Sequence, residues 1–338
     1  MTKKINILIF IAILTLCSCG QKNDQLKLQT KENLLGTVIS ISTYDAKQNV
    51  YDECFNMVLD IDEKMSVNRA DSEISKVNQR AGEEKTLVSD DTYKLIEKSK
   101  KFSELSDGLF DITIGAVVEK WKVSGIFAKL PKGNEIEETL PLVGYDKIEL
   151  SPDNYIKLSQ KGMKLDLGAV AKGYACDKAV EILKKHNVKS ALLDFGGNIY
   201  VHGTKNDGSL WKVGIRNPLL NEEGYICYIE VSDKSIVTSG VYERYFSVDD
   251  ENYHHLIDPR TGYPSDNGLI SVTIISPISH EADILSTACF VSGVKDGLKL
   301  LEKIPDADGI FITSDKKIYM TDGLKDKIKL TNSEFTID

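Results

Sequence analysis

The chain contains 338 residues, which suffices for one large domain or for two small ones with a buried core. Its composition is that of an ordinary globular protein. The formal net charge of −9 argues against nucleic acid as a partner, because phosphate binding needs a basic face.

The first residues have the features of an export signal. Two lysines precede a nearly continuous apolar run at residues 5–16, which has the size of a signal-peptide core and is too short to span a bilayer. The run ends in Leu16-Cys17-Ser18-Cys19, which resembles the lipobox of bacterial lipoproteins. We therefore expect a signal peptide at residues 1–18 and a lipid-modified Cys19.

This interpretation places the mature protein at the cell membrane, lipid-anchored on the extracytoplasmic side. Residues 19–32 are polar and rich in Lys, Gln and Asn, so they predict a flexible membrane tether, and residues 33–338 are the folded part. A plain secretory signal and an uncleaved N-terminal anchor are the alternatives.

The cysteines beyond residue 19 are widely spaced. They contain no C-x-x-C pair, so neither a zinc site nor a dense disulfide framework is indicated. Most lie among apolar residues and are expected to be small core side chains, although one disulfide between two of them is left open. They are Cys54, Cys176, Cys227 and Cys289.

Hydrophobic periodicity and turn residues predict the elements of the first half of the chain. Asp71, Ser72 and Glu73 are typical of a helix start. The polar stretch 129–146, with two prolines, is predicted to be a surface excursion and a subdomain seam. The further predictions are a strand at 34–43, helices near 50–65 and 91–105, a helix and loop at 117–127, and a β-hairpin at 147–158.

The second half is predicted to be richer in strands. There is no regular βαβ alternation, so the fold class is α+β, with mainly antiparallel sheets and packed helices. The predicted strands are 164–167, 190–195, 198–202, 211–215, 226–231, 270–276, 309–313 and 318–321, and the predicted helices are 172–185 and one starting at 282.

Residues 166–177, DLGAVAKGYACD, combine a small-residue turn with the start of a helix. Small residues let a ligand approach the backbone, and a helix N-terminus offers unpaired N–H groups to an anion such as a diphosphate. The chain has no G-x-x-x-x-G-K-[ST] motif and no G-x-G-x-x-G fingerprint, so a P-loop NTPase and a Rossmann dehydrogenase are not indicated.

Residues 282–293, ADILSTACFVSG, predict a helix on which Asp283 and Thr287 share one face. A carboxylate and a hydroxyl so placed suit Mg²⁺, which prefers hard oxygen ligands and keeps positions for phosphate oxygens. The alternative is that both side chains serve only as helix caps.

Residues 237–264 contain a Thr-Ser-Gly turn, an aromatic-rich strand pair, two adjacent histidines and the Asp-Pro-Arg-Thr-Gly turn. Asp258-Pro259 favours a turn, and Gly262 can adopt the positive φ that closes it. This turn fixes the preceding His254 and His255, which could otherwise be ordinary histidines at a strand end.

These three motifs, preceded by Gly36-Thr37, resemble in sequence and in order the ApbE family of bacterial FAD:protein FMN transferases. The family pattern runs TSG-x-Y-x-R … H-x-I-D-P-x-T-G-x-P, and residues 108–115 match its G-x-x-D-x-T-x-G segment. The resemblance spans residues from about 34 to 293 and implies an ApbE-like fold for residues 33–338.

The resemblance also implies a set of site residues. His255 is the expected catalytic base, because counting back three residues from Asp258 selects it over His254. Asn68 stands where relatives often place an aromatic residue over the flavin, and this departure weakens the expectation of stacking on FAD. Ser286 stands where many relatives place an Asp, and a hydroxyl there compensates less of the metal's charge. The expected FAD-binding residues are Leu35, Asn68, Leu109, Phe110, Asp111, Asp166, Lys172 and Ile257, and the expected Mg²⁺ ligands are the Ala169 carbonyl, Asp283, Ser286 and Thr287.

The implied reaction is Mg²⁺-dependent transfer of FMN from FAD to a Thr or Ser hydroxyl of an extracytoplasmic target flavoprotein, with release of AMP. The acceptor would be a subunit of a membrane redox complex or a flavin-bearing reductase. An FAD pyrophosphatase that releases free FMN and AMP is one alternative, and a non-catalytic FAD-binding lipoprotein is another. A solute-binding lipoprotein is disfavoured, because its two α/β lobes are not seen.

Overall fold

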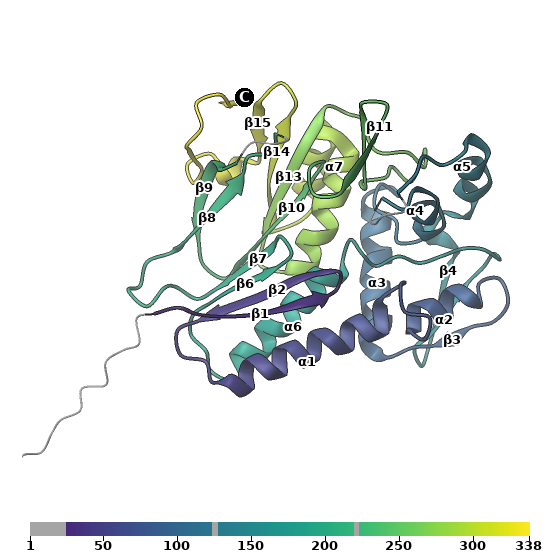
Figure 1. Cartoon of the computed structure of the whole chain (residues 1–338), viewed down its shortest axis with the longest axis horizontal. Helices are drawn as coiled ribbons and strands as arrows, with labels where there is room; N and C mark the ends of the chain where they lie inside the picture. The colour runs from purple at the N-terminus through teal and green to yellow at the C-terminus, as the bar shows by residue number, and fades with distance from the viewer. Residues whose placement is uncertain (1–24, 124–127, 220–222) are drawn as a thin grey trace, which may run out of the picture.

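The computed structural model describes residues 25–123, 128–219 and 223–338 (Figure 1). The predicted signal peptide at residues 1–18 and Cys19 lie outside this part of the chain. Within the described ranges, no helix combines the length and the apolar character needed to cross a bilayer.

A nine-stranded sheet runs through the molecule in the order β1-β2-β6-β7-β10-β13-β14-β15-β17. Its neighbouring strands are antiparallel, except that β17 runs parallel to β15. The fold class is therefore α+β, as predicted. The strands are β1 (Lys27–Leu34), β2 (Thr37–Thr43), β6 (Ala191–Phe195), β7 (Asn198–His202), β10 (Lys234–Gly240), β13 (Leu269–Ser276), β14 (Asp308–Thr313), β15 (Lys317–Met320) and β17 (Thr336–Ile337).

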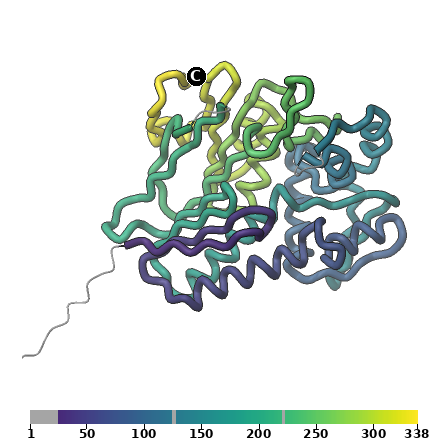
Figure 2. The backbone as a smooth tube through the Cα atoms, in the orientation of Figure 1, coloured from purple at the N-terminus to yellow at the C-terminus, as the bar shows by residue number. Residues whose placement is uncertain are grey.

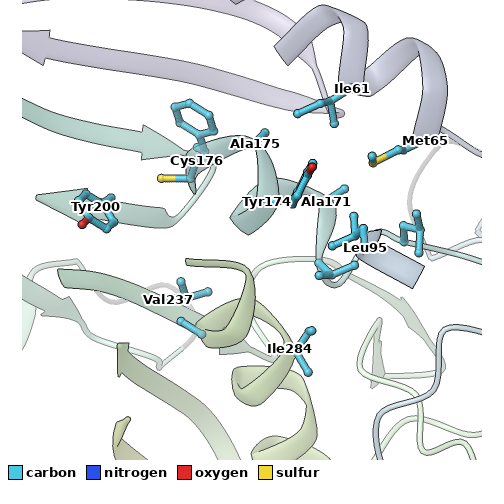
Figure 3. Close-up of a cluster of buried hydrophobic side chains, with 14 of the residues drawn as sticks. Ile61, Met65, Leu95, Ala171, Tyr174, Ala175, Cys176, Tyr200, Val237 and Ile284 are labelled. Carbon is cyan, nitrogen blue, oxygen red and sulfur yellow. The ribbon is translucent and has the colours of Figure 1, made fainter. Parts of the chain in front are cut away.

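Three long helices pack beside this sheet: α1 (Gln48–Met65), α6 (Ala171–Lys185) and α7 (Ser279–Glu302). Their apolar faces share the largest hydrophobic core, in which α1, α6 and α7 contribute the labelled side chains of Figure 3 such as Ile61, Ala175 and Ile284. Gly293 interrupts α7 with φ 76° and ψ 174°, at the residue where the sequence motif also ends. The N-terminal half of α7 is thus a separate straight segment fixed by the core.

A second, three-stranded sheet is built from β16 (Lys329–Leu330), β9 (Tyr225–Val231) and β8 (Trp211–Arg216). Its buried side chains, such as Trp211 and Ile215, share a second core with Ile236 of β10 and Ile275 of β13. The central strands of the large sheet are therefore covered on both faces.

The elements between α1 and α6 form the other end of the molecule, blue to teal in Figure 2. A small sheet with the order β3-β5-β4 lies there, and a third core gathers around Trp121. These elements are α2 (Glu73–Gln79), β3 (Thr86–Leu87), α3 (Asp90–Leu105), α4 (Gly115–Trp121), α5 (Gly133–Thr139), η1 (Leu140–Leu142), η2 (Tyr145–Lys147), β4 (Ile148–Ser151) and β5 (Tyr155–Leu158). Two further elements are the hairpin of β11 (Tyr245–Val248) with β12 (Glu251–His254), and η3 (Asp322–Leu324).

Most of the predicted elements are confirmed. The helix start at Ser72 is confirmed by the hydrogen bond that the Ser75 N–H donates to the Ser72 hydroxyl. The predicted hairpin at 147–158 is β4 and β5, and its turn contains Asp153 and Asn154 at positive φ. The four described cysteines are free and buried, so the disulfide that was left open is not formed.

The tether prediction for residues 19–32 is wrong for residues 27–32. These residues belong to β1, which pairs with β2 at the edge of the large sheet. The side chains of β1 are mostly exposed, so the sequence lacks the apolar alternation that marks a strand. Main-chain pairing with β2 forms this strand instead.

Three local predictions are corrected. Thr238-Ser239-Gly240 is not a turn but the end of β10, because β13 pairs with it. Residues 164–167 are not a strand: the Asn78 side-chain amide bonds the N–H and the carbonyl of Leu165 at 2.7 and 3.0 Å, as a neighbouring strand would. The excursion at 129–146 contains α5, whose single buried apolar residue Ile136 gives little helical periodicity. The predicted seam there stays a prediction.

Candidate active site

The N-terminal halves of α6 and α7 meet at Gly173. A Cβ at this position would lie 2.5 Å from the Ser279 carbonyl oxygen and 2.6 Å from the His280 Cα. Only glycine therefore permits the two helix backbones to approach so closely. The approach brings Asp283, one turn further along α7, to the backbone of α6.

Asp283 is buried, with 4% of its surface exposed, and its carboxylate caps the start of α6. The first N–H groups of an α-helix have no partner within the helix, and Gly173, the third residue of α6, carries one of them. This N–H donates to Asp283 Oδ2 at 3.0 Å. The Asp283 carboxylate is therefore held against the start of α6, which the Ala169 carbonyl directly precedes.

Lys172 is the cation nearest to this carboxylate. Its Nζ lies 3.5 Å from Asp283 Oδ1 and donates to the Gly168 carbonyl at 3.3 Å. The predicted FAD-binding lysine is therefore in contact with the predicted metal ligand Asp283. Its side chain is 18% exposed, which disfavours the alternative of a solvated helix lysine.

Thr287 and Ser286 differ in what their hydroxyls contact. Thr287 is partly exposed and lies four residues after Asp283 on α7, on the same face as predicted. Ser286 is fully buried; its hydroxyl lies 2.8 Å from that of Ser239 on β10 and donates to the Asp283 carbonyl at 2.9 Å. Ser286 thus joins α7 to the Thr-Ser-Gly segment of β10, and its role as a metal ligand stays a prediction.

The residues present fit a Mg²⁺ ion. The described ranges hold no group of three or more His, Cys, Asp and Glu side chains arranged for a metal. The predicted set is of another kind: one buried carboxylate, one main-chain carbonyl and one hydroxyl, all of them the hard oxygens that Mg²⁺ prefers. The ammonium of Lys172 beside Asp283 shows that this carboxylate already attracts positive charge.

The start of α7 is held by Asp177, the last residue of the α6 motif. Its carboxylate accepts hydrogen bonds from the N–H groups of Ser279 and His280 at 2.8 and 2.9 Å. The His280 Nδ1 lies 2.6 Å from the same carboxylate, and Lys98 Nζ lies 3.1 Å from Nε2. No role was predicted from the sequence for Asp177, His280 or Lys98. The one indication was the position of Asp177 at the end of the 166–177 motif, one helical turn after Gly173.

His255 follows β12 directly. Its backbone N–H and its Nδ1 both lie 3.2 Å from the carbonyl oxygen of Arg244. Because a carbonyl only accepts, Nδ1 carries the proton and Nε2 is the unprotonated nitrogen of the neutral ring. Desolvation of the ring by burial lowers the pKa of His255 well below its ordinary value, and the positive charges of Arg244 and Lys172 lower it further.

His254 is engaged differently. Its Nδ1 accepts the Leu256 N–H at 3.2 Å, and its Nε2 lies 3.2 Å from the Ser265 carbonyl. The ring packs edge-on against Phe290 of α7, and burial lowers its pKa. Both nitrogens of His254 are used within the fold, which agrees with the prediction of His255 as the base.

Glu243 and Arg244 also belong to this site. Arg244 is the arginine of the TSG-x-Y-x-R pattern, and neither residue was assigned a role from the sequence. Burial is the main cause that raises the pKa of the Glu243 carboxyl group to about 7, and the negative charge of Asp283 acts in the same direction. The positive charges of Lys172 and Arg244 act in the opposite direction. Glu243, Lys172, Arg244, His255 and Asp283 therefore act on one another electrostatically.

Two predicted flavin contacts lie on turns; Leu35 is partly buried against the largest core, whereas Asn68 is exposed. Leu35 forms the β1–β2 turn with Gly36, at φ 51° and 70°, a backbone region that a bulky residue rarely adopts. Asn68 is exposed, and its N–H donates to the Ser66 hydroxyl at 3.2 Å. The structure links neither directly to His255 or Asp283.

The residues of the 108–115 segment have mainly structural contacts. Phe110 is buried in the largest core, while Leu109 is partly exposed. The Asp111 carboxylate accepts bonds from the N–H and hydroxyl of Thr113 and from the N–H of Tyr145, and burial raises its pKa. This carboxylate holds the segment against η2.

Asp166 and Ile257 are the remaining predicted FAD-binding residues. Asp166 Oδ1 accepts the Gly168 N–H at 2.8 Å and so shapes the turn before α6. Ile257 is 7% exposed and packs with Trp121 in the third core. Lys172 and Asp283 are thus in contact at the α6–α7 junction. Metal binding by Ala169, Asp283 and Thr287 and flavin contact by the other predicted residues stay predictions.

The sequence is similar to a known family. A family model described as the ApbE family matches residues 35–311. The FAD:protein FMN transferase of Treponema pallidum (strain Nichols) is 34% identical over 340 residues, covering 95% of this chain and 94% of that protein. The FAD:protein FMN transferase of Klebsiella pneumoniae (strain 342) is 34% identical over 289 residues, covering 85% and 90%.

Solved structures show the same architecture. The ApbE protein of Thermotoga maritima superposes with a TM-score of 0.82 at 33% identity, covering 89% of this chain and 98% of that chain. The flavin transferase ApbE from Vibrio cholerae superposes with a TM-score of 0.80 at 25% identity, covering 90% and 100%.

Proposed function

Because the chain belongs to the ApbE family, we propose that it transfers FMN from FAD to a Thr or Ser hydroxyl of an acceptor protein, with AMP as the leaving group. Its relatives are named FAD:protein FMN transferases, and the chain is an enzyme of that kind. In the proposed reaction the acceptor Oγ forms a bond to the FMN phosphorus. The bond from that phosphorus to the oxygen shared with AMP breaks.

The observation that supports this proposal best is the position of His255 beside Arg244, within the electrostatic reach of Lys172. Since Nδ1 is bonded to the Arg244 carbonyl, Nε2 is left to accept the proton of the incoming hydroxyl. The lowered pKa keeps this nitrogen unprotonated at neutral pH. The positive charges of Lys172 and Arg244 would stabilise negative charge on the phosphoryl oxygens.

We include Mg²⁺ in the proposal, held by the Ala169 carbonyl, Asp283 and Thr287. Bound there, it would neutralise negative charge on the diphosphate of FAD. The Lys172 ammonium contacts Oδ1 of Asp283, and the Gly173 N–H donates to Oδ2. Both carboxylate oxygens are therefore held at the start of α6. Positioning and charge neutralisation are the main contributions to phosphoryl transfer.

The cellular setting is part of the proposal. A lipid on Cys19 would hold the enzyme on the extracytoplasmic side of the membrane, where an acceptor from a redox complex or a flavin reductase would meet it. The apolar run at residues 5–16 and the Leu16-Cys17-Ser18-Cys19 sequence support this setting.

The test combines the full chain, FAD and a protein known to carry phosphoester-linked FMN on a threonine, purified without that FMN. Intact-mass spectrometry of this acceptor should show one added FMN with Mg²⁺ and none when the metal is chelated. An acceptor whose threonine is changed to valine should stay unmodified. Release of FMN and AMP beside an unmodified acceptor would replace the proposal with a pyrophosphatase, and unchanged bound FAD would replace it with a binding protein.

A further inference from the structure

Lys172 and the proposed Mg²⁺ ion depend on the same carboxylate oxygen. Asp283 has two carboxylate oxygens, and the Gly173 N–H donates to Oδ2 at 3.0 Å. The other oxygen, Oδ1, lies 3.5 Å from the Lys172 Nζ. In the part of the chain that the structure describes, no other donor lies within hydrogen-bond distance of Oδ1. The Lys172 ammonium therefore contacts the oxygen on which a metal ion at Asp283 would depend.

The same ammonium also lies against the turn before α6. Its Nζ donates to the Gly168 carbonyl at 3.3 Å, and the next residue, Ala169, provides the predicted carbonyl ligand. Lys172 thus links Asp283 of α7 to the turn at 168–169, which are the two segments that the proposed Mg²⁺ would link. A dication and an ammonium group held so close together repel each other, most of all where water is largely excluded.

The burial of Asp283 makes a positive partner necessary. The residue is 4% exposed, and a buried carboxylate that loses its positive partner destabilises the fold. Lys172 supplies this positive charge in the structure. A metal ion bound to Oδ1 would supply it instead, and the ammonium would then be free to leave.

The Lys172 side chain has a second place for its charge. A lysine carries its ammonium on a flexible four-carbon stem, and this side chain is 18% exposed. Lys172 also acts electrostatically on His255, whose pKa it helps to lower. Since the reacting phosphorus must lie near His255, the diphosphate of FAD would come within reach of the same ammonium, and a lysine binds phosphate well as a point charge.

We propose that Lys172 and Mg²⁺ are alternative partners of Asp283, and that FAD draws the Lys172 ammonium onto its diphosphate, so that FAD and Mg²⁺ strengthen each other's binding. This inference rests on the proposed function. Without FAD, Lys172 competes with the metal for Oδ1 and keeps the metal affinity low. With FAD, phosphate oxygens engage the ammonium, and Oδ1 becomes available. By linkage, FAD raises the metal affinity by the same factor by which the metal raises the FAD affinity.

Direct contact between Mg²⁺ and the diphosphate would also couple the two ligands, with or without Lys172. The two origins of coupling make opposite predictions for an enzyme without FAD. Competition by the ammonium predicts that removing Lys172 strengthens metal binding there. Direct contact alone predicts no gain, because no phosphate is present.

The first test therefore measures metal binding to the full chain without FAD. The probe is Mn²⁺, which takes the same hard oxygen ligands as Mg²⁺ and whose free concentration is read by electron paramagnetic resonance. Lys172→Met should bind Mn²⁺ about tenfold more tightly than the unaltered enzyme, a factor typical of coupled sites. Lys184→Met removes the same charge from the last turn of α6 and should bind Mn²⁺ as the unaltered enzyme does. Asp283→Asn gives the background binding elsewhere on the protein.

A charge-preserving variant separates competition from altered packing. Lys172→Arg keeps the positive charge, so it should bind Mn²⁺ no more tightly than the unaltered enzyme. Urea denaturation shows that each variant is folded. Tighter binding by both Lys172 variants would attribute the gain to packing and overturn the inference. Unchanged or weaker binding by folded Lys172→Met would overturn it as well.

The second test measures the coupling itself. FAD binding is followed by fluorescence with and without Mg²⁺ in His255→Ala enzyme, in which turnover of FAD is slowed. Mg²⁺ should strengthen FAD binding about tenfold or more, and adding Lys172→Met should reduce that factor. The factor is compared rather than the affinity, because Lys172→Met also removes a phosphate contact.

An equal factor in the two proteins would overturn the inference. If the unaltered enzyme still transfers FMN in a Mg²⁺-dependent reaction, the proposed function would then stand without the competition. Absence of FMN transfer together with absence of metal binding at Asp283 would overturn both.

Discussion

The adjacent residues His254 and His255 differ in the nitrogen that each leaves available. Both have a lowered pKa, so charge state alone does not separate them. His254 uses both nitrogens within the fold, whereas His255 uses only Nδ1. Hydrogen bonding therefore favours His255 as the proposed general base, and the sequence pattern of the family selects the same residue.

Arg244 should control the pH at which the enzyme loses activity. A base works unprotonated, so the rate falls as the pH drops through the pKa of His255, which lies below the ordinary value of 6.5. Arg244→Gln removes a charge that lowers this pKa, so the acid limb of the kcat/KM profile should move to higher pH. Lys212→Gln, on β8, is the control and should leave the limb in place. An unshifted limb in Arg244→Gln would contradict the assignment of that limb to His255.

Leu35 illustrates a conflict between stability and binding. A type I′ turn favours Asn at its first position, whereas Leu at φ 51° is strained by about 1 kcal/mol. Because the Leu35 side chain also packs against the largest core, Leu35→Asn should raise the free energy of unfolding by at most about 1 kcal/mol, measured by urea denaturation. If Leu35 contacts the flavin, the same variant should bind FAD more weakly in a fluorescence titration. Leu28→Asn, an exposed change on β1 without positive φ, should give neither effect.

At the scale of elements, the junction of α6 and α7 decides the geometry of the site. Asp283 of α7 accepts the N–H of Gly173 in the first turn of α6, and Asp177 of α6 accepts the first N–H groups of α7. The two helix starts thus stabilise each other reciprocally. Ser286 adds a bond from α7 to β10, so three elements fix the direction of Asp283.

Gly173→Ala should disrupt this junction. The added Cβ would lie within 2.6 Å of both the Ser279 carbonyl oxygen and the His280 Cα, so the helices must separate. Overpacking of this kind costs about 1–3 kcal/mol, and we expect that loss in urea denaturation together with a weaker Mg²⁺ dependence of FMN transfer. Gly133→Ala is the matched control, because no atom lies within 4 Å of a Cβ there. A Gly173→Ala protein as stable as the Gly133→Ala protein would show that the junction is looser than described.

At the scale of the whole molecule, the α+β class and most long elements could be predicted from periodicity and turn residues. The strand β1 could not, because an edge strand with exposed polar side chains has no apolar pattern. The Thr-Ser-Gly segment was predicted as a turn, because the pairing of β10 with the distant β13 is not visible in local sequence. Main-chain pairing, which the side-chain pattern does not record, accounts for both errors.

The candidate site was predictable only in part. Asp283 and Thr287 follow from helical spacing, and the small-residue turn marked α6. The hydrogen bond from Gly173 to Asp283 and the roles of Glu243 and Arg244 depend on contacts between residues more than 100 positions or several strands apart. Phe110 and Ile257, expected at the cofactor from the family pattern, have their side chains in apolar cores.

The thiols report on the integrity of the two larger hydrophobic cores, which contain all four described cysteines. Burial raises the pKa of Cys54 and Cys227 to about 12 and that of Cys176 well above its ordinary value. A thiolate is the reactive form, so these thiols and that of Cys289 should resist iodoacetamide in the native protein and react after unfolding. Peptide mass spectrometry after labelling measures this. Labelling of any of the four cysteines under native conditions would indicate that the hydrophobic core around that cysteine opens.

The most direct test of the account is the single-turnover rate of FMN transfer at saturating FAD and acceptor, compared between the unaltered enzyme and His255→Ala. Loss of a general base should lower this rate by a factor of about 10²–10⁴ while FAD affinity is retained. That result would assign the proton transfer to His255. A rate within about threefold of the unaltered enzyme would contradict the account, because a positioned base contributes far more than that.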